Sequence, residues 1–160
     1  MTGQIHDKVI FEGLEYDLVS VSGEGLFEPS EHGMLPQMLH TACWRGFYCA
    51  YAIEQSELFL TSLTIRTQDG QYPPIDGIFP TDDDYGTMRY LGLRLPMLFR
   101  GKLLLGTEFI REKYVHMGFQ SPDAYQKIVE VTFLEGKLTD TQDRSVNFSQ
   151  NNPVIPPPKL

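Results

Sequence analysis

Short polar interruptions divide the apolar parts of this chain into runs of the length of a β-strand. Four segments consist of two apolar runs around one such interruption: 9–18, 47–65, 93–106 and 127–140. Three of the interruptions contain glycine: Glu12-Gly13, Arg100-Gly101 and Glu135-Gly136. Glycine adopts the positive φ angles of tight hairpin turns without steric cost. We therefore predict four β-hairpins, the second of which turns through residues 55–57 without glycine.

The residues beside these turns alternate in the way that strands with one buried face alternate. From Phe47 to Ile53 every second residue is expected on the core face, and the same holds for Val129, Val131 and Phe133. Roughly eight to ten strands joined by hairpins predict a mainly β fold. The two architectures that fit are an antiparallel barrel and a two-sheet sandwich.

Helices are expected to be few and short. Ser121-Pro122-Asp123 is typical of a helix start and predicts a helix at 122–127, and a second helical turn is expected at 37–40 after Pro36. Segment 67–90 is rich in glycine, proline and aspartate, which indicates a long loop. Residues 1–145 are predicted to form a single β domain, and the proline-rich residues 146–160 an extended, loosely attached tail.

The charge of the chain bears on its partners and its location. Thirteen basic and 21 acidic residues give a net charge of −8, which repels the phosphates of nucleic acid and anionic membranes. No apolar run approaches the roughly 18–20 residues that span a bilayer, and the first residues lack the pattern of a secretion signal. Cys43 and Cys49 would lie about 20 Å apart along a strand, too far for a disulfide. We therefore expect a cytoplasmic protein that binds neither nucleic acid nor membrane.

Two short motifs contain residue types that bind metals or activate nucleophiles. His40 and Cys43 in HTACW would share one face of a helix, where an imidazole can activate a thiol. Alternatively, Cys43 is a small buried residue and His40 a polar residue at the start of a strand. A zinc site needs about four ligands, and Asp82-Asp83-Asp84 lacks the spacing of a calcium loop. We expect no metal and no cofactor.

The stretch EKYVHMGFQ, residues 112–120, contains a further candidate histidine. If the stretch is extended, His116 shares one face with Tyr114 and Gly118, whereas Phe119 and its alternate neighbours face the core. A histidine in that setting can act as a general base or hydrogen-bond a ligand, or it is a half-exposed surface residue. We select Tyr114 and His116 as candidate ligand-binding residues.

The dipeptide Trp44-Arg45 precedes the aromatic residues Phe47, Tyr48 and Tyr51. Arginine beside exposed aromatic side chains is typical of binding hot spots, although an ordinary β core with one charge at its edge has the same composition. We select Trp44 and Arg45 as further candidate ligand-binding residues. The phrase WRGFYCAYAI, followed by a turn and LFL, resembles the early strands of ligand-binding up-and-down barrels, over too few residues to assign that family.

Three hypotheses of function follow. The first is a non-catalytic binding module for a small apolar or planar ligand or for a protein partner. It is favoured because nucleotide-binding, nucleophile-elbow and metalloprotease motifs are missing from the sequence. The second is a small enzyme with a histidine-based site in the mouth of a barrel. The third is an acidic inhibitor-type or immunity-type protein that masks a basic partner.

Overall fold

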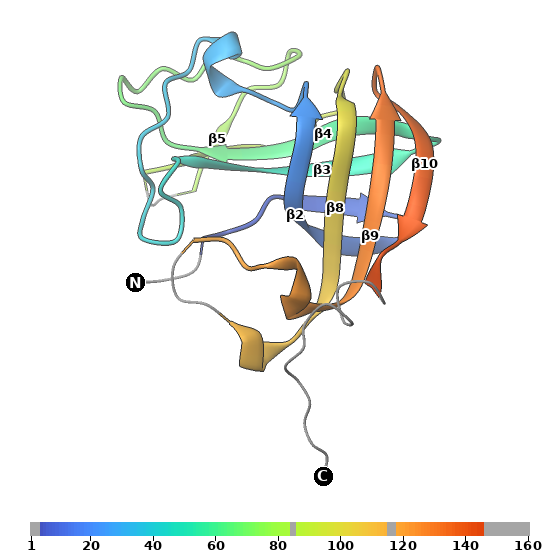
Figure 1. Ribbon diagram of the computed structural model, residues 1–160. Helices are drawn as coiled ribbons and strands as arrows, with labels where there is room; N and C mark the ends of the chain where they lie inside the picture. The colour runs from blue at the N-terminus through green and yellow to red at the C-terminus, as the bar shows by residue number, and fades with distance from the viewer. Residues whose placement is uncertain (1–3, 84–85, 115–117, 146–160) are drawn as a thin grey trace.

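The computed structural model describes residues 4–83, 86–114 and 118–145, and its fold is mainly β (Figure 1). The strands are β1 (Lys8–Phe11), β2 (Leu14–Glu24), β3 (Phe47–Glu54), β4 (Glu57–Ile65), β5 (Thr81–Asp82), β6 (Met88–Tyr90), β7 (Leu95–Pro96), β8 (Arg100–Phe109), β9 (Tyr125–Leu134) and β10 (Lys137–Asp143). The described helical elements are short 3-10 turns: η1 (Pro29–His32), η2 (Arg111–Lys113) and η3 (Pro122–Ala124). No helix in these described ranges is long and apolar enough to cross a membrane.

The strands form one sheet that closes into a ring. Its order is β10-β9-β8-β2-β1-β3-β4, with β6 and β5 continuing beyond β4, and β10 also pairs with β4. This return contact joins a single residue pair, Lys137 with Glu57, beside a 2.8 Å hydrogen bond from Leu138 N to Ser56 O. In Figure 1, β2, β8, β9 and β10 run side by side, and β3 and β4 cross behind them. The predicted β fold is confirmed, with a ring-like arrangement.

One strand pair departs from the antiparallel pattern. β1 pairs with β2 in an antiparallel manner but with β3 in a parallel manner, with Val9 opposite Tyr51. A parallel pair needs a long connection, and here β2 and the segment that contains η1 separate the two strands in sequence. The other described strand pairs are antiparallel, as predicted.

Three of the four predicted hairpins are confirmed. Glu12-Gly13 joins β1 to β2, Gln55-Ser56 joins β3 to β4, and Glu135-Gly136 joins β9 to β10. The non-glycine residues of these turns also have positive φ angles, from 51° to 64°. The turns are therefore of the kind that matches the twist of paired strands.

The predicted hairpin at 93–106 is wrong, because Gly101 lies inside β8 rather than in a turn. It pairs with Gly23 of β2 on one side and with Phe133 of β9 on the other. A Cβ atom on Gly101 would lie 2.1 Å from the carbonyl oxygen of Ser22, and one on Gly23 would lie 2.1 Å from that of Arg100. Glycine is present because two backbones approach closely, which is its other structural use.

The helix predictions are only partly confirmed. The helix expected at 122–127 is reduced to η3, because β9 begins at Tyr125. The helical turn expected at 37–40 is wrong: Gln37 N donates to Arg66 O at 2.7 Å, and Leu39 N to Cys43 O at 3.1 Å, so these residues bond across to other segments. In the described part of the predicted loop, residues 67–83 and 86–90, the regular elements are the short strands β5 and β6 and isolated bridges. The predicted tail at 146–160 lies outside the described residues.

Apolar side chains fill the interior of the ring. The predicted core faces of 47–53 and 129–133 are confirmed, since Tyr51 is 1% exposed and Phe133 is 2% exposed, and their alternate partners are buried with them. A smaller cluster of Ala124, Tyr125 and Ile128 packs against Leu104 of β8. The hollows described below lie at the surface of the protein, outside this packed core.

Candidate functional site

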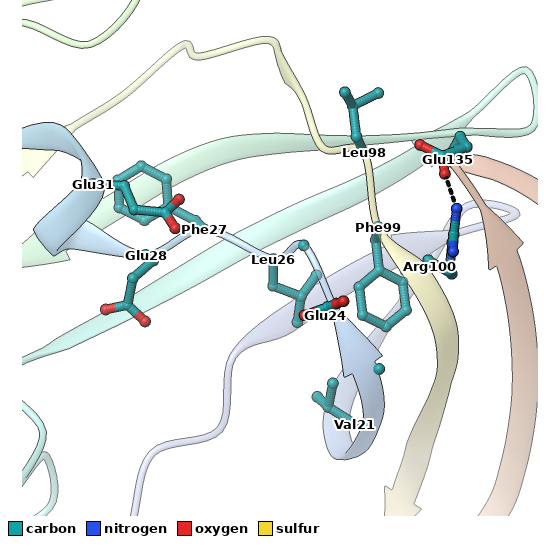
Figure 2. Close-up of a pocket in the computed structure, with 12 residues that line it drawn as sticks. Val21, Glu24, Leu26, Phe27, Glu28, Glu31, Leu98, Phe99, Arg100 and Glu135 are labelled. Carbon is teal, nitrogen blue, oxygen red and sulfur yellow. Dashed lines mark hydrogen bonds and ion pairs between the residues drawn. The ribbon is translucent and has the colours of Figure 1, made fainter.

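A hollow of about 730 Å³ opens where the end of β2 passes the start of β8 (Figure 2). A neighbouring hollow of about 230 Å³ shares Val21, Leu26 and Phe27 with it. The two hollows therefore adjoin each other, and we call them together the acidic groove. The lining of its larger part includes the apolar residues Val21, Leu26, Phe27, Leu98 and Phe99 beside charged side chains and backbone.

Three carboxylates lie along the acidic groove. Glu24, Glu28 and Glu31 all line it and are all exposed. None of them forms an ion pair with a cation of the described residues. Figure 2 shows Glu28 and Glu31 beside Phe27, and the ion pair between Arg100 and Glu135 on the opposite side. The groove therefore combines several apolar side chains with uncompensated negative charge.

The chain between β2 and η1 fixes the position of these side chains. A Cβ atom on Gly25 would lie 2.7 Å from Leu98 O, so glycine lets this segment lie directly against the residues before β8. Phe27 is held from two directions, because its N–H donates to the Tyr51 hydroxyl at 3.2 Å and its ring stacks on His32 at 4.7 Å. Phe27 thus belongs both to the lining of the groove and to the main core.

An ion pair between the buried Asp7 and the partly exposed Arg45 lies at the smaller end of the groove. The side chain of Asp7 is only 8% exposed, and it accepts hydrogen bonds from Cys49 N at 2.8 Å and from the Arg45 guanidinium. Arg45 also donates to Phe47 O at 2.9 Å and lies 4.3 Å from the centre of the Phe47 ring. Burial raises the pKa of the Asp7 carboxyl, and the guanidinium and the Cys49 N–H oppose that rise.

The other titratable groups near this end are not poised for chemistry. Burial raises the pKa of the Cys49 thiol and of the Tyr51 phenol well above their usual ranges, so both stay protonated near neutral pH. A protonated, buried thiol is a poor nucleophile. This end of the groove therefore fits a structural and binding role better than a catalytic one.

The sequence-selected residues lie in different places. Arg45 lines the smaller part of the acidic groove. Trp44 is 43% exposed, and its backbone N–H donates to Gln4 Oε1 at 2.8 Å. Tyr114 lines a separate hollow of about 220 Å³, and His116 lies outside the described residues.

The predicted register of 112–120 is wrong at its described end. Phe119, expected on the core face, is 49% exposed, whereas Gln120 is buried at 8%. The cause is a contact with the N-terminal segment: Gln120 N donates to His6 Nε2 at 3.1 Å, and the buried His6 ring contacts Phe119 edge to face. At the other end of the stretch, residues 111–113 form η2 instead of a strand.

The remaining motifs have structural roles in the described chain. Cys43 N donates to His40 O at 2.9 Å within a tight turn, so the two residues do not share a helix face. Cys43 is buried, and that burial raises its pKa, whereas His40 is exposed. Asp83 accepts a hydrogen bond from the Thr87 hydroxyl, and Asp84 lies outside the described residues. Within the described ranges no group of three or more His, Cys, Asp or Glu is placed to hold a metal.

Several residues of the groove carry no signal in the sequence. Glu24, Glu28 and Glu31 follow neither a strand period nor a known motif, and Asp7 lies 38 positions from Arg45. The one local signal is that Glu24 lies between Gly23 and Gly25, which indicates an irregular segment. Neither family models, nor curated proteins, nor solved structures gave a match to this chain.

Proposed function

We propose that this protein is a non-catalytic binding module whose acidic groove holds a basic, partly apolar segment of a protein partner. The observation that carries the proposal is the set of apolar side chains in the groove flanked by three glutamates that no cation of the described residues pairs with. Leu98 is 68% exposed and Val21 is 45% exposed, so apolar side chains of a partner would cover surface that now faces water. Basic side chains of the same segment would meet the glutamates.

The whole chain supports this choice of partner. Its net charge of −8 attracts basic proteins and repels nucleic acid. The ring interior is filled by side chains, which favours a surface partner over a small ligand held inside the sheet. A cytoplasmic location belongs to the proposal and is supported by two buried cysteines that are not bonded to each other. The alternative of a histidine-based enzyme stays a prediction, because His116 lies outside the described residues.

The test is a titration with a labelled peptide of alternating lysine and leucine, followed by fluorescence anisotropy. We expect the wild type to bind it with an affinity that falls as salt is added. The variant Glu24→Gln with Glu28→Gln and Glu31→Gln is expected to raise Kd about tenfold, the combined effect of three solvent-screened charges. Its fold should be unchanged, since all three side chains are exposed.

The matched control removes the same number of charges elsewhere. The variant Glu12→Gln with Glu112→Gln and Asp140→Asn changes three exposed acids that do not line the groove. It should bind the peptide within about threefold of wild type, because long-range surface charge is screened. Equal loss in both triple variants, or equal binding of a peptide with glutamate in place of lysine, would contradict the proposal.

A further inference from the structure

Three aromatic rings surround a hollow of about 220 Å³ at the junction of β8 and β9. Phe109 is the last residue of β8, Tyr125 is the first of β9, and Tyr114 follows η2. The Phe109 ring lies 5.5 Å from the Tyr125 ring and 6.4 Å from the Tyr114 ring, edge to face in both cases, at 65° and 84°. Asp17, Gln4, Ile5 and Gln120 complete the lining. We call this the aromatic hollow.

One ring is fixed and two are presented to solvent. Tyr125 is 4% exposed, and its hydroxyl donates to Asp17 Oδ2 at 2.7 Å. Its ring packs directly on Gly106, where an added Cβ atom would lie only 2.7 Å from the ring. Phe109 and Tyr114 are 40% and 42% exposed, although they lie beside each other. Neighbouring aromatic side chains left half in water on a rigid base are typical of a binding site.

The charges around the aromatic hollow are mainly negative. A second hollow of about 240 Å³ adjoins it, sharing Asp17, Phe109 and Tyr125, and is also lined by Glu15, Glu108 and Lys8. Lys8 pairs with Asp17, which leaves the two glutamates as the uncompensated charges of the lining.

Glu108 is also unusual in its backbone. Its φ of 61° lies within β8, whereas the other described non-glycine residues with positive φ are in turns. Such a conformation costs about 1 kcal/mol or more and gathers at ligand sites.

We propose that the aromatic hollow binds a quaternary ammonium group, either free or at the end of a trimethylated lysine. Ring faces attract cations because their π electrons are negative, and this attraction is the basis of known aromatic cages. A primary ammonium needs several acceptors, but the Asp17 carboxylate already accepts from Lys8 and from the Tyr125 hydroxyl. Both polar atoms of the Gln4 amide are also bonded, to Thr41 O and Trp44 N. A quaternary ammonium needs none. The hollow is below the roughly 300–1,000 Å³ of sites for drug-sized ligands, so it suits a small head group.

The decisive comparison is between choline and its neutral carbon analogue, 3,3-dimethylbutan-1-ol, which has the same shape. We expect choline to shift the backbone amide signals of Gly106 and Phe109 in a two-dimensional NMR titration of the full chain. The neutral analogue should bind at least about tenfold more weakly, because it lacks the charge that the rings attract. Equal binding of the two would overturn the proposal in favour of a merely apolar hollow. No shift at 50-fold excess of choline over protein would overturn it as well.

A variant links the binding to the rings. Tyr114→Leu keeps an apolar side chain at a half-exposed position, so the protein should fold and bind choline at least about fivefold more weakly. Phe79→Leu is the matched control, because Phe79 is 72% exposed and does not line the hollow. Unchanged choline binding by a folded Tyr114→Leu variant would contradict the assignment.

The same titration distinguishes the two sources of the ligand. A short peptide that contains trimethyllysine, compared with its unmethylated form, reports recognition of a protein. Tighter binding of the methylated peptide than of choline would identify a modified protein as the source, and the reverse order would identify a choline-type small molecule or head group. This site does not depend on the acidic groove, so Glu24→Gln with Glu28→Gln and Glu31→Gln should leave choline binding unchanged.

Discussion

Replacement of Gly101 by alanine is expected to lower the free energy of unfolding by about 3–5 kcal/mol, or to prevent folding altogether. The added methyl group would stand 2.1 Å from Ser22 O, an atom of the neighbouring backbone that cannot rotate away. The φ angle of 139° is a second cost, because residues with a Cβ rarely adopt it. β2 and β8 would have to separate at the point where Gly23 pairs with Gly101, and the acidic groove lies beside that pair.

Gly13→Ala separates the two causes of that loss. Gly13 also has a positive φ, of 81°, but a Cβ atom there would meet nothing within 4 Å. We therefore expect a loss of only about 1–2 kcal/mol, the cost of the left-handed conformation alone. Urea unfolding followed by circular dichroism measures both variants. Similar losses for Gly101→Ala and Gly13→Ala would show that β2 and β8 do not approach as closely as described.

Replacement of Asp7 by alanine is expected to lower the free energy of unfolding by about 1–3 kcal/mol, the usual cost of leaving a buried hydrogen-bond donor without its acceptor. The change leaves the buried Cys49 N–H without its acceptor and removes the partner that orients Arg45. Glu54→Ala is the matched control, because it breaks an ion pair with Arg94 in which both side chains are about half exposed. That control should cost less than about 1 kcal/mol. Equal costs in thermal unfolding would contradict the buried position of Asp7.

The pH dependence of stability gives a second test of Asp7. Burial raises its pKa in the folded state above the 3.8 of an exposed aspartate, so the folded protein holds this proton more tightly. The resulting stabilisation is fully present below pH 3.8 and is lost as the pH rises through the folded-state pKa. Asp7→Asn keeps an acceptor for Cys49 N–H but does not titrate. We expect the stability of wild type relative to Asp7→Asn to fall as pH rises over this window, measured by urea unfolding at several pH values.

The opposite sign would carry a definite meaning. If wild type gains stability over Asp7→Asn as the pH rises, the attraction of Arg45 outweighs the burial of the carboxyl. The pair would then be a net source of stability at neutral pH instead of a cost that the fold tolerates.

Local chemistry in the sequence predicted the elements that depend on neighbouring residues. The turns at Glu12-Gly13 and Glu135-Gly136 were correct because a tight turn is decided within a few positions. Arg100-Gly101 has the same local form, yet Gly23, far away in the chain, makes it part of a strand. The sequence indicates that position 101 needs glycine, but only the strand order shows that the need comes from the close approach of β2 and β8.

The candidate sites show the same division between local and distant information. Arg45 and Tyr114 were selected from their immediate composition, and each lines a hollow. Their partners could not be found in this way, because Asp7 reaches Arg45 through the fold, and Phe109 meets Tyr125 only through the pairing of β8 with β9. A single sequence contains no periodic signal that joins such residues.

The small return contact of the ring has a consequence for how copies of this chain behave at high concentration. Beyond Leu138, β10 has no partner on its outer side among the described residues, so its backbone could template the growth of a foreign sheet. Asp140 and Asp143 are exposed there, and the backbone N–H of Ser145 lowers the pKa of Asp143. Two such edges brought together would meet with like charges, even in mildly acidic solution. We therefore expect the exposed carboxylates of β10 to disfavour the pairing of this edge with the same edge of a second copy.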